Sequence, residues 1–267
     1  MVTKQDVLKM LADSGLKKDG WATIHCSLRS IGEIEGGADG LIDAFKEYLS
    51  DGVFLVPTHT WGVCNVQNPR YNVKETVPNI GVLSQVAAFR PDAVRTLHPT
   101  HSLAVFAKNA EELARGEENS KTPCPVGGLL SRLYENEGKV FLIGVGHERN
   151  TYLHAVDEMI DIKNRLNPNK YTMEIIDYDG NSIKTENYCG HYTKGLDYCC
   201  AKHYPNYEKA FDYHNAVYYT TLGNATVRAC DVKRMTDVVI GMWKNTDHDL
   251  CFGEQEIPLE YYESLEI

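Results

Sequence analysis

One segment, residues 141–158, does most to restrict the fold. It opens with an apolar run, is interrupted by Gly144 and Gly146, and resumes with helical spacing at Thr151. A strand, a glycine turn and a helix in this order bring polar side chains to the carboxyl edge of a sheet, where α/β proteins bind ligands. The segment therefore predicts an α/β protein with a site at this edge.

The predicted helix carries a cluster of polar side chains on one face. Thr151, His154 and Asp157 are spaced three residues apart, and Glu158 follows directly. Positions three or four apart are neighbours on a helix, and a neutral imidazole beside a carboxylate is a suitable general base. The alternative is a surface histidine that only hydrogen bonds to a neighbour. We favour the catalytic interpretation because a second polar motif lies upstream.

The rest of the chain alternates short apolar runs with amphipathic segments, which predicts a layered α/β fold. Strands are expected over residues 21–25, 53–57, 101–107, 140–144, 217–222 and 225–228. Helices are expected over residues 3–16, 39–50, 83–89, 108–115, 129–134 and 231–244, and a long loop over 62–80. Thr3 and Asp6 predict a capped start for the first helix.

Residues 163–215 differ in character from the rest. Asp179-Gly180 between alternating runs at 172–178 and 182–186 is a strong hairpin signal. The residues up to 214 are dense in Tyr, His, Asp and Cys. We expect an antiparallel, hairpin-rich insertion that shapes a substrate-binding surface, within a single domain of residues 1–267. The alternative is that the aromatic residues only pack the hairpin.

Composition excludes several functional classes. The 267 residues are 43% hydrophobic and 24% charged, which is ordinary for a globular protein. A net charge of −10 argues against a nucleic-acid partner and is compatible with a cationic small molecule. No apolar stretch approaches ~18 residues and no signal sequence precedes the first helix, so we expect a cytoplasmic protein without a membrane span.

The eight cysteines predict reduced thiols and no metal site, because no Cys-x-x-Cys pair is present. A metal site at Cys189, His191 and His203 remains an alternative. A nucleophilic Cys26 beside His25 is disfavoured, because neighbours on a strand point to opposite faces.

Three further motifs carry polar or turn-forming residues. Residues 27–39 end in Gly36-Gly37 before a helix, where bare amides can hold a phosphate. Residues 95–102 contain an arginine, two histidines and a hydroxyl before a strand. Residues 122–128 form a Pro- and Gly-rich turn without chemistry of its own.

In order and spacing, these motifs resemble those of the antibiotic N-acetyltransferases, that is, the aminoglycoside 3-N-acetyltransferases and their relatives. The matching stretches are His25-Cys-Ser-Leu28 with Gly36-Gly-Ala-Asp39, then Arg95-Thr-Leu-His-Pro-Thr-His-Ser102, then Gly144-Val-Gly-His-Glu-Arg-Asn-Thr-Tyr-Leu-His-Ala-Val-Asp157. The resemblance covers residues 5–160 well and 162–267 only loosely.

Four positions depart from the family pattern. Cys26 and Thr96 each replace a serine, Glu148 replaces an aspartate, and Asp157 replaces a glutamate. The last change shortens the carboxylate by one methylene, so its contact with His154 is expected to be remade by Glu158 or a water.

The resemblance implies a three-layer α/β/α fold with a central mixed sheet, and acetyl transfer from acetyl-CoA to the 3-amino group of the 2-deoxystreptamine ring of aminoglycosides. It implies direct transfer with His154 as the general base, oriented by Asp157 or Glu148. His147 is expected to fold back toward the site, and Thr151 or a backbone amide to stabilise the oxyanion. The expected CoA contacts are Ser27, Leu28, Arg29, Ile34, Gly36, Gly37, Arg95, Thr96, His98 and Ser102.

The substrate is expected to be held by acidic residues of the divergent region, namely Asp177, Asp179, Glu186, Asp197 and Asp212. We expect a monomer or a homodimer. Three alternatives stay open: an acyltransferase acting on another amine, a CoA-binding module without activity, and a metal-dependent hydrolase that uses His25, His59, His98, His101 and His147.

Overall fold

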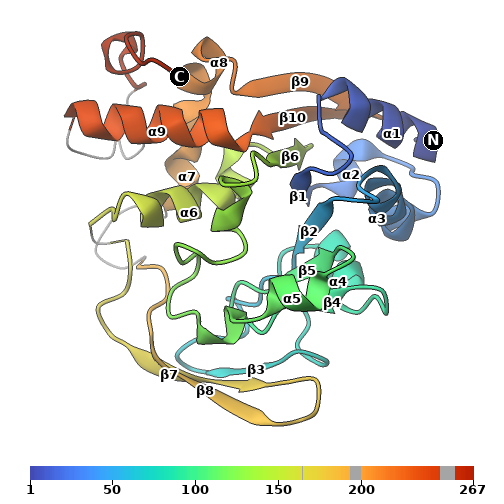
Figure 1. The fold of residues 1–267 in the computed structure, drawn as a ribbon, viewed down its shortest axis with the longest axis vertical. Helices are drawn as coiled ribbons and strands as arrows, with labels where there is room; N and C mark the ends of the chain where they lie inside the picture. The colour runs from blue at the N-terminus through green and yellow to red at the C-terminus, as the bar shows by residue number, and fades with distance from the viewer. Residues whose placement is uncertain (164, 193–199, 247–255) are drawn as a thin grey trace.

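A computed structural model describes residues 1–163, 165–192, 200–246 and 256–267. Its centre is a seven-stranded mixed sheet in the order β4-β5-β2-β1-β6-β10-β9 (Figure 1). The strands are β1 (Trp21–Cys26), β2 (Val53–Pro57), β4 (Val94–Arg95), β5 (Leu103–Phe106), β6 (Lys139–Ile143), β9 (Val217–Leu222) and β10 (Ala225–Asp231). Strands β2, β1 and β6 are parallel, and the strands outside them are antiparallel. The predicted mixed sheet is confirmed.

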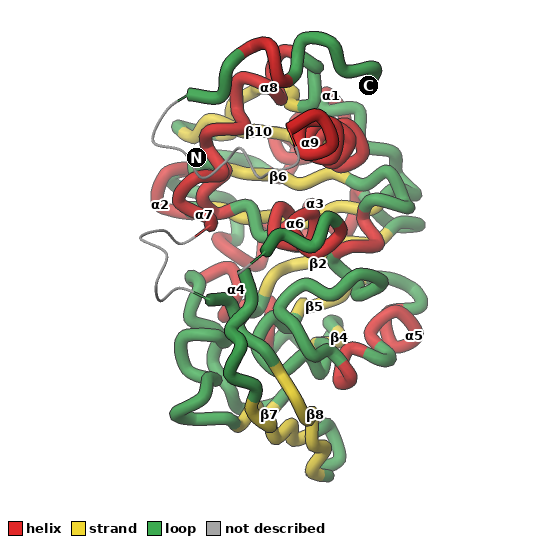
Figure 2. The backbone as a smooth tube through the Cα atoms, turned by 90° about the vertical axis from the view of Figure 1, so that its left-hand side faces the viewer, coloured by secondary structure: helices red, strands yellow, loops and turns green. Residues whose placement is uncertain are grey.

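Helices cover both faces of this sheet. They are α1 (Lys4–Asp13), α2 (Leu28–Ile31), α3 (Gly37–Tyr48), α4 (Val82–Ala88), α5 (Ala110–Ala114), α6 (Tyr152–Met159), α7 (Cys200–His203), α8 (Glu208–Tyr213) and α9 (Val232–Thr246). The described residues also form five 3₁₀ turns, namely η1 (Glu117–Asn119), η2 (Ser131–Leu133), η3 (His147–Arg149), η4 (Tyr204–Tyr207) and η5 (Leu259–Tyr261). In Figure 2, β10, β6, β2 and β5 follow one another down the view with helices around them.

The central strands are mostly apolar because both of their faces are largely buried. Phe141 and Ile143 of β6 pack with α1, α3 and α4, whereas Val140 and Leu142 pack with α6, α8 and α9. Alternate residues of a strand point to opposite faces, so a strand between two helical layers is apolar at most of its positions. The three layers follow from this pattern.

A second sheet of three strands lies apart from the first (Figure 1). Its strands are β3 (Arg70–Asn72), β7 (Tyr171–Ile176) and β8 (Ser182–Tyr188), and β7 and β8 form the predicted hairpin. The Asp177 carboxylate accepts bonds from the amides of Asp179 and Asn181, and Gly180 takes a φ of 86°. The prediction of a structureless loop over 62–80 is wrong at β3, which is a strand only because β7 lies beside it.

The two helices expected between β5 and β6 are shorter than predicted, and one of them is of another type. The helix expected over 129–134 is the 3₁₀ turn η2, and the helix expected over 108–115 is the shorter α5. The capping box of Thr3 and Asp6 at the start of α1 is confirmed. No helix in the described part of the chain is both long and apolar enough to cross a membrane.

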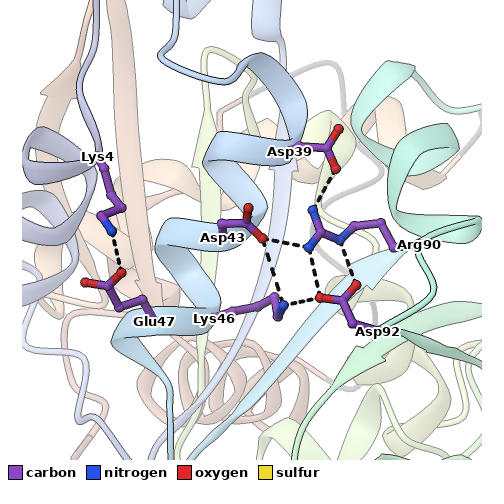
Figure 3. A network of polar contacts seen from close by, with 7 residues as sticks. All are labelled: Lys4, Asp39, Asp43, Lys46, Glu47, Arg90 and Asp92. Carbon is purple, nitrogen blue, oxygen red and sulfur yellow. Dashed lines mark hydrogen bonds and ion pairs between the residues drawn. The ribbon is translucent and has the colours of Figure 1, made fainter.

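Arg90, which follows the end of α4, forms ion pairs with two aspartates of α3 (Figure 3). Its guanidinium contacts Asp39 at 2.6 Å, Asp43 at 2.7 Å and Asp92 at 2.8 Å, and it lies over the ring of Phe106. These ion pairs lower the pKa of Asp92. Asp39, the last residue of the motif at residues 27–39, is therefore paired with Arg90 within the protein.

We predict that Arg90→Ala lowers the free energy of unfolding by roughly 1–2 kcal/mol, because one guanidinium serves three carboxylates while single surface pairs contribute less. Urea unfolding at low and high salt measures the loss, which should shrink at high salt. Lys9→Ala, which removes only the exposed pair with Asp13, is the control. If both variants lost the same free energy of unfolding, the ion pairs of Arg90 would not have the stabilising role proposed here.

Candidate active site

The candidate catalytic histidine lies on α6, directly beyond the carboxyl end of β6. The chain leaves β6 through Gly144 at a φ of 68°, where a Cβ would stand 2.5 Å from the Cβ of Ser30. Only glycine fits this left-handed, closely approached position. The turn η3 follows, and α6 then presents His154 at the sheet edge. The predicted strand, glycine turn and helix are confirmed.

A tyrosine hydroxyl joins His154 to Asp157. The Oη atom of Tyr204 lies 2.6 Å from His154 Nδ1 and 2.5 Å from Asp157 Oδ2. The direct separation of Nδ1 and Oδ2 is 3.9 Å, too long for a hydrogen bond. The contact expected between histidine and carboxylate is therefore made through Tyr204.

Glu158, the residue expected to restore this contact, faces other partners. Its carboxylate accepts bonds from Thr122 Oγ1 and the Cys124 amide, and one of its oxygens lies 3.1 Å from Arg165 Nη1. The turn at 122–128 thus holds Glu158 in a buried ion pair.

Burial sets the charge states of the pair. It lowers the pKa of His154 to about 3, with a smaller contribution from the positive charge of Arg165. It raises the pKa of Asp157 to about 7, against the hydrogen bond from Tyr204. Both shifts arise because a charge is poorly solvated there. The imidazole of His154 is neutral at neutral pH, as a general base must be.

Four further histidines line this region. Ring centroids are separated by 4.2 Å between His154 and His191, 5.3 Å between His191 and His101, and 4.6 Å between His101 and His59. Burial lowers the pKa of His59, His101 and His191 well below the usual value for histidine, and it lowers the pKa of His25 to about 4. Within the described residues, the Nε2 atoms of His25, His59 and His191 have no hydrogen-bond partner. The histidines form an uncharged polar wall.

The first group of predicted CoA contacts lies at the carboxyl end of β1. The Ser27 hydroxyl accepts a hydrogen bond from the Ser30 amide, so Ser27 is the N-cap of α2. This helix contains Leu28 and Arg29. The other members of the group, Ile34, Gly36 and Gly37, lead into the 12-residue helix α3. Gly36 is its N-cap and offers no side-chain cap, and both glycines are exposed.

The second group of predicted CoA contacts is buried and hydrogen bonded within the protein. Arg95 donates to the carbonyls of Thr58, Val73 and Thr76, and its guanidinium lies over Tyr71. The other members also have hydrogen-bond partners within the protein. The Thr96 hydroxyl accepts a bond from the Leu103 amide, and the Ser102 hydroxyl donates to the Thr58 carbonyl. The ring of His98 bonds the Thr122 carbonyl through Nε2 and accepts bonds from the amides of Thr100 and His101 at Nδ1. These bonds give Arg95, Thr96, His98 and Ser102 a positioning role.

The structure does not bring every predicted catalytic residue together. The ring of His147 is buried 5.0 Å from that of Phe211 and next to Asn150, rather than folded back onto His154. Glu148 is exposed and accepts a bond from the Gly146 amide. Thr151 is the N-cap residue of α6.

The acidic residues expected to hold a cation are spread over the molecule. Asp177 and Asp179 lie in the β7–β8 turn and Glu186 lies on β8, whereas Asp212 lies on α8 near the opposite end (Figure 1). Asp212 instead accepts a bond from Tyr219. Asp197 lies outside the described residues. Those that are described do not converge on one cleft.

The thiol and metal alternatives have little structural support. Burial raises the pKa of the Cys26 thiol to about 12, so it is not a thiolate. Over the described ranges, no three His, Cys, Asp or Glu side chains are placed to hold a metal ion. Of the histidines suggested for a hydrolase, His147 packs on α8 and His98 uses both ring nitrogens in hydrogen bonds.

Three residues around the acid–base pair were not predicted from sequence in this role, namely Arg165, His191 and Tyr204. All three belong to the divergent segment 163–215, where no spacing rule connects them to α6. The composition of this segment, rich in Tyr and His, was the one available signal. Their positions agree with the predicted insertion that shapes the site, which stays a prediction.

Fold and site together define an α/β protein with a buried acid–base group at the edge of a mixed sheet. A family model described as aminoglycoside 3-N-acetyltransferase matches residues 23–244, and the chain belongs to this family. Aminoglycoside N(3)-acetyltransferase IV of Salmonella sp is 28% identical over 159 residues, 60% of either chain. The matched region thus spans less than two thirds of that relative. The acetyltransferase-like protein YokD of Bacillus subtilis is 26% identical over 190 residues, 62% of this chain and 68% of that protein.

Solved structures share the fold over nearly the whole chain. The apoenzyme of aminoglycoside acetyltransferase AAC(3)-IVa superposes with a TM-score of 0.73 at 21% identity, covering 98% of this chain and 96% of that one. A mutant of that enzyme in complex with a gentamicin gives 0.75 at 21% identity, with the same coverage. AAC-IIIb with CoASH gives 0.72 at 17% identity, covering 88% and 93%.

We predict that stability falls steeply as the pH drops from 6.5 toward 4. Burial lowers the pKa of His25, His98 and His147 to about 4, so below pH 6.5 only the unfolded chain binds those protons. Each such histidine contributes up to about 1.4 kcal/mol per pH unit. Glu117 and Asp157, with pKa values raised to about 7, act in the opposite direction but are fewer.

Urea unfolding at pH 7.5, 6 and 5 measures this dependence. His25→Gln should reduce the slope by about one proton, since it removes one titrating group. An unfolding free energy that stays constant over this range would contradict the neutral histidine wall.

Proposed function

We propose that this protein is an acetyl-CoA-dependent N-acetyltransferase that acts on the 3-amino group of the 2-deoxystreptamine ring of aminoglycosides. The observation that carries the proposal is His154, a neutral, hydrogen-bonded imidazole at the sheet edge of a member of this family. Its side chain is 13% exposed, so the ring is within reach of a bound molecule.

The proposed chemistry is direct transfer. The substrate amine is mostly protonated near neutral pH, so it first releases one proton to the solvent and then attacks the thioester carbonyl with its lone pair. His154 takes a proton from the attacking nitrogen as the N–C bond forms. The C–S bond then breaks, and the proton on His154 passes to the departing thiolate, which leaves as the free thiol. A base in this position contributes ~10²–10⁴-fold.

The proposed oxyanion donor is Thr151 or a backbone amide at the start of α6. Donors fixed in place before reaction stabilise the charge that develops on the thioester oxygen. Thr151, the N-cap residue of α6, lies three positions before His154, so the two residues share one side of the helix.

The proposed CoA site comprises Ser27, Leu28, Arg29, Ile34, Gly36 and Gly37. The amino end of a 12-residue helix offers amides and a positive dipole to phosphate, and two exposed glycines let a ligand approach the backbone. A relative, AAC-IIIb, was solved with CoASH. Arg95, Thr96, His98 and Ser102 position the neighbouring histidines in this proposal.

The proposed substrate is a cationic amine. Relatives were solved with a gentamicin and with sisomicin, and the net charge of −10 attracts polycations over long range. A second candidate is acyl transfer to a different amine. It is favoured by the spread of the acidic residues, because no acidic cleft is formed by the described part of segment 163–215.

Release of free CoA thiol from acetyl-CoA across gentamicin, kanamycin, neomycin and simpler amines separates these candidates, with product mass as the second readout. Acetylated aminoglycoside supports the first. Product from another amine alone supports the second, and CoA binding without any product would contradict both.

We predict that His154→Ala lowers kcat by at least about 100-fold while CoA affinity stays within about twofold, since a general base acts on the reaction and not on cofactor binding. Thiol release measures turnover, and calorimetry with CoA measures binding. His214→Ala, a histidine whose Nε2 lies 2.7 Å from the Tyr262 carbonyl oxygen far from α6, is the control. Turnover within threefold of wild type would exclude His154 as the base.

We predict that Gly37→Asp raises the KM for acetyl-CoA about fivefold, because a carboxylate at the helix start repels phosphate at a cost of ~1 kcal/mol. Gly37→Asn is the matched control: Asn also tolerates a φ of 61°, and open space surrounds this position. Steady-state kinetics at two salt concentrations checks this. Equal KM values for the two variants would move the CoA site elsewhere.

A further inference from the structure

Tyr204 occupies an unusual place between the base and its carboxylate. Its hydroxyl oxygen is within hydrogen-bond distance of both groups, which are 3.9 Å apart from each other. Tyr204 is fully buried, and Asp157 is 1% exposed. At this depth a hydrogen-bonded chain is strong and few waters compete with it. The geometry makes the three groups one unit.

The direction of the hydrogen bonds depends on one proton. An ionised Asp157 can only accept, so the Tyr204 hydroxyl donates to it and accepts from Nδ1–H of His154. The lone pair of the imidazole then lies on Nε2. A protonated Asp157 donates to Tyr204 instead, the hydroxyl donates to Nδ1, and the ring hydrogen moves to Nε2. The two arrangements differ in which ring nitrogen is basic.

We propose that Tyr204 is a positioning residue that relays the ionisation state of Asp157 to His154, so that Nε2 is free to accept a proton only while Asp157 is ionised. The proposal rests on the proposed role of His154 as general base. The family pattern has a glutamate at position 157, one methylene longer than the aspartate of this chain.

The relay conserves protons in the forward reaction. One proton passes from the substrate amine to Nε2, the Nδ1 proton passes to Oη, and the hydroxyl proton passes to Oδ2 of Asp157. The same steps in reverse return the proton to Nε2 for the leaving thiolate. No bond other than N–H and O–H bonds within the chain is made or broken by the relay.

The relay also explains how a weakly basic ring can act near neutral pH. With a pKa of about 3, His154 alone would hold an abstracted proton poorly, whereas Asp157 has a pKa of about 7. Coupled groups take up a proton as a unit, with an apparent pKa that belongs to the pair. A general base is most effective when its pKa lies near the pH at which the enzyme works.

The guanidinium of Arg165 and several neutral histidine rings lie around His154 and Asp157. Arg165, from the segment after α6, acts on both His154 and Asp157, and its own partner is Glu158. His191, after β8, packs against His154, and His25 of β1 also interacts with it. Because burial holds these histidines neutral, Asp157 is the group that changes charge near neutral pH.

The test compares Tyr204→Phe with wild type, with Tyr152→Phe as the matched control. Tyr152, on α6, is likewise fully buried, but its hydroxyl bonds Thr236 of α9. The ratio of wild-type to Tyr204→Phe kcat/KM should be at least about tenfold at pH 9 and approach one below pH 6. Substrate amine ionisation cancels in this ratio. A ratio that is constant with pH, or equal to that of the control, would overturn the relay.

A second readout does not depend on turnover. Nitrogen NMR of ring-labelled protein without substrate reports which nitrogen of His154 carries hydrogen. The wild type should change from Nδ1–H to Nε2–H as the pH falls through neutrality, whereas Tyr204→Phe and Asp157→Asn should show no such change. Absence of the change in folded wild type would overturn the relay even if His154→Ala is inactive. Its presence alongside an active His154→Ala would instead refute the proposed base.

Discussion

Burial of a carboxyl group beside an imidazole is the constraint on which the site depends. Asp157 and His154 lie where charge is poorly solvated, so each is driven toward its neutral form and the pair shares protons. The hydroxyl of Tyr204 makes this burial tolerable by bonding both. Without it, an acceptor would be left unpaired in the interior at a cost of ~1–3 kcal/mol.

The motif around Arg95 acts indirectly on the same site. Its guanidinium and the Ser102 hydroxyl bond carbonyls of the loop after β2, and His98 fixes the turn that carries His101. Residues that sequence similarity groups as a ligand site thus hold the histidine wall in place. A buried arginine whose donors meet three carbonyls and the hydroxyls of Thr58 and Ser102 gives geometric precision, since few other arrangements satisfy those donors.

Local patterns predicted the elements well. The capping box at Thr3, the Asp179-Gly180 hairpin and the turn at Gly144 depend on residues close together in the chain, and all three are confirmed. The strand β3 could not be predicted, because its pairing with β7 joins residues about a hundred positions apart. Neither could the placement of the β7–β8 turn, which contains Asp177, and of α8, which contains Asp212, at opposite ends of the molecule (Figure 1).

The sequence by itself determined the layered fold, the family and the i, i+3 placement of His154 and Asp157, because these follow from periodicity and ordered motifs. Only the tertiary structure decided what lies between those two side chains. Helical spacing brings a histidine and a carboxylate near each other, but here Nδ1 of His154 and Oδ2 of Asp157 stay 3.9 Å apart. The hydroxyl that fills the gap comes from Tyr204, 47 positions beyond Asp157, and only packing of the distant segment onto α6 could place it there.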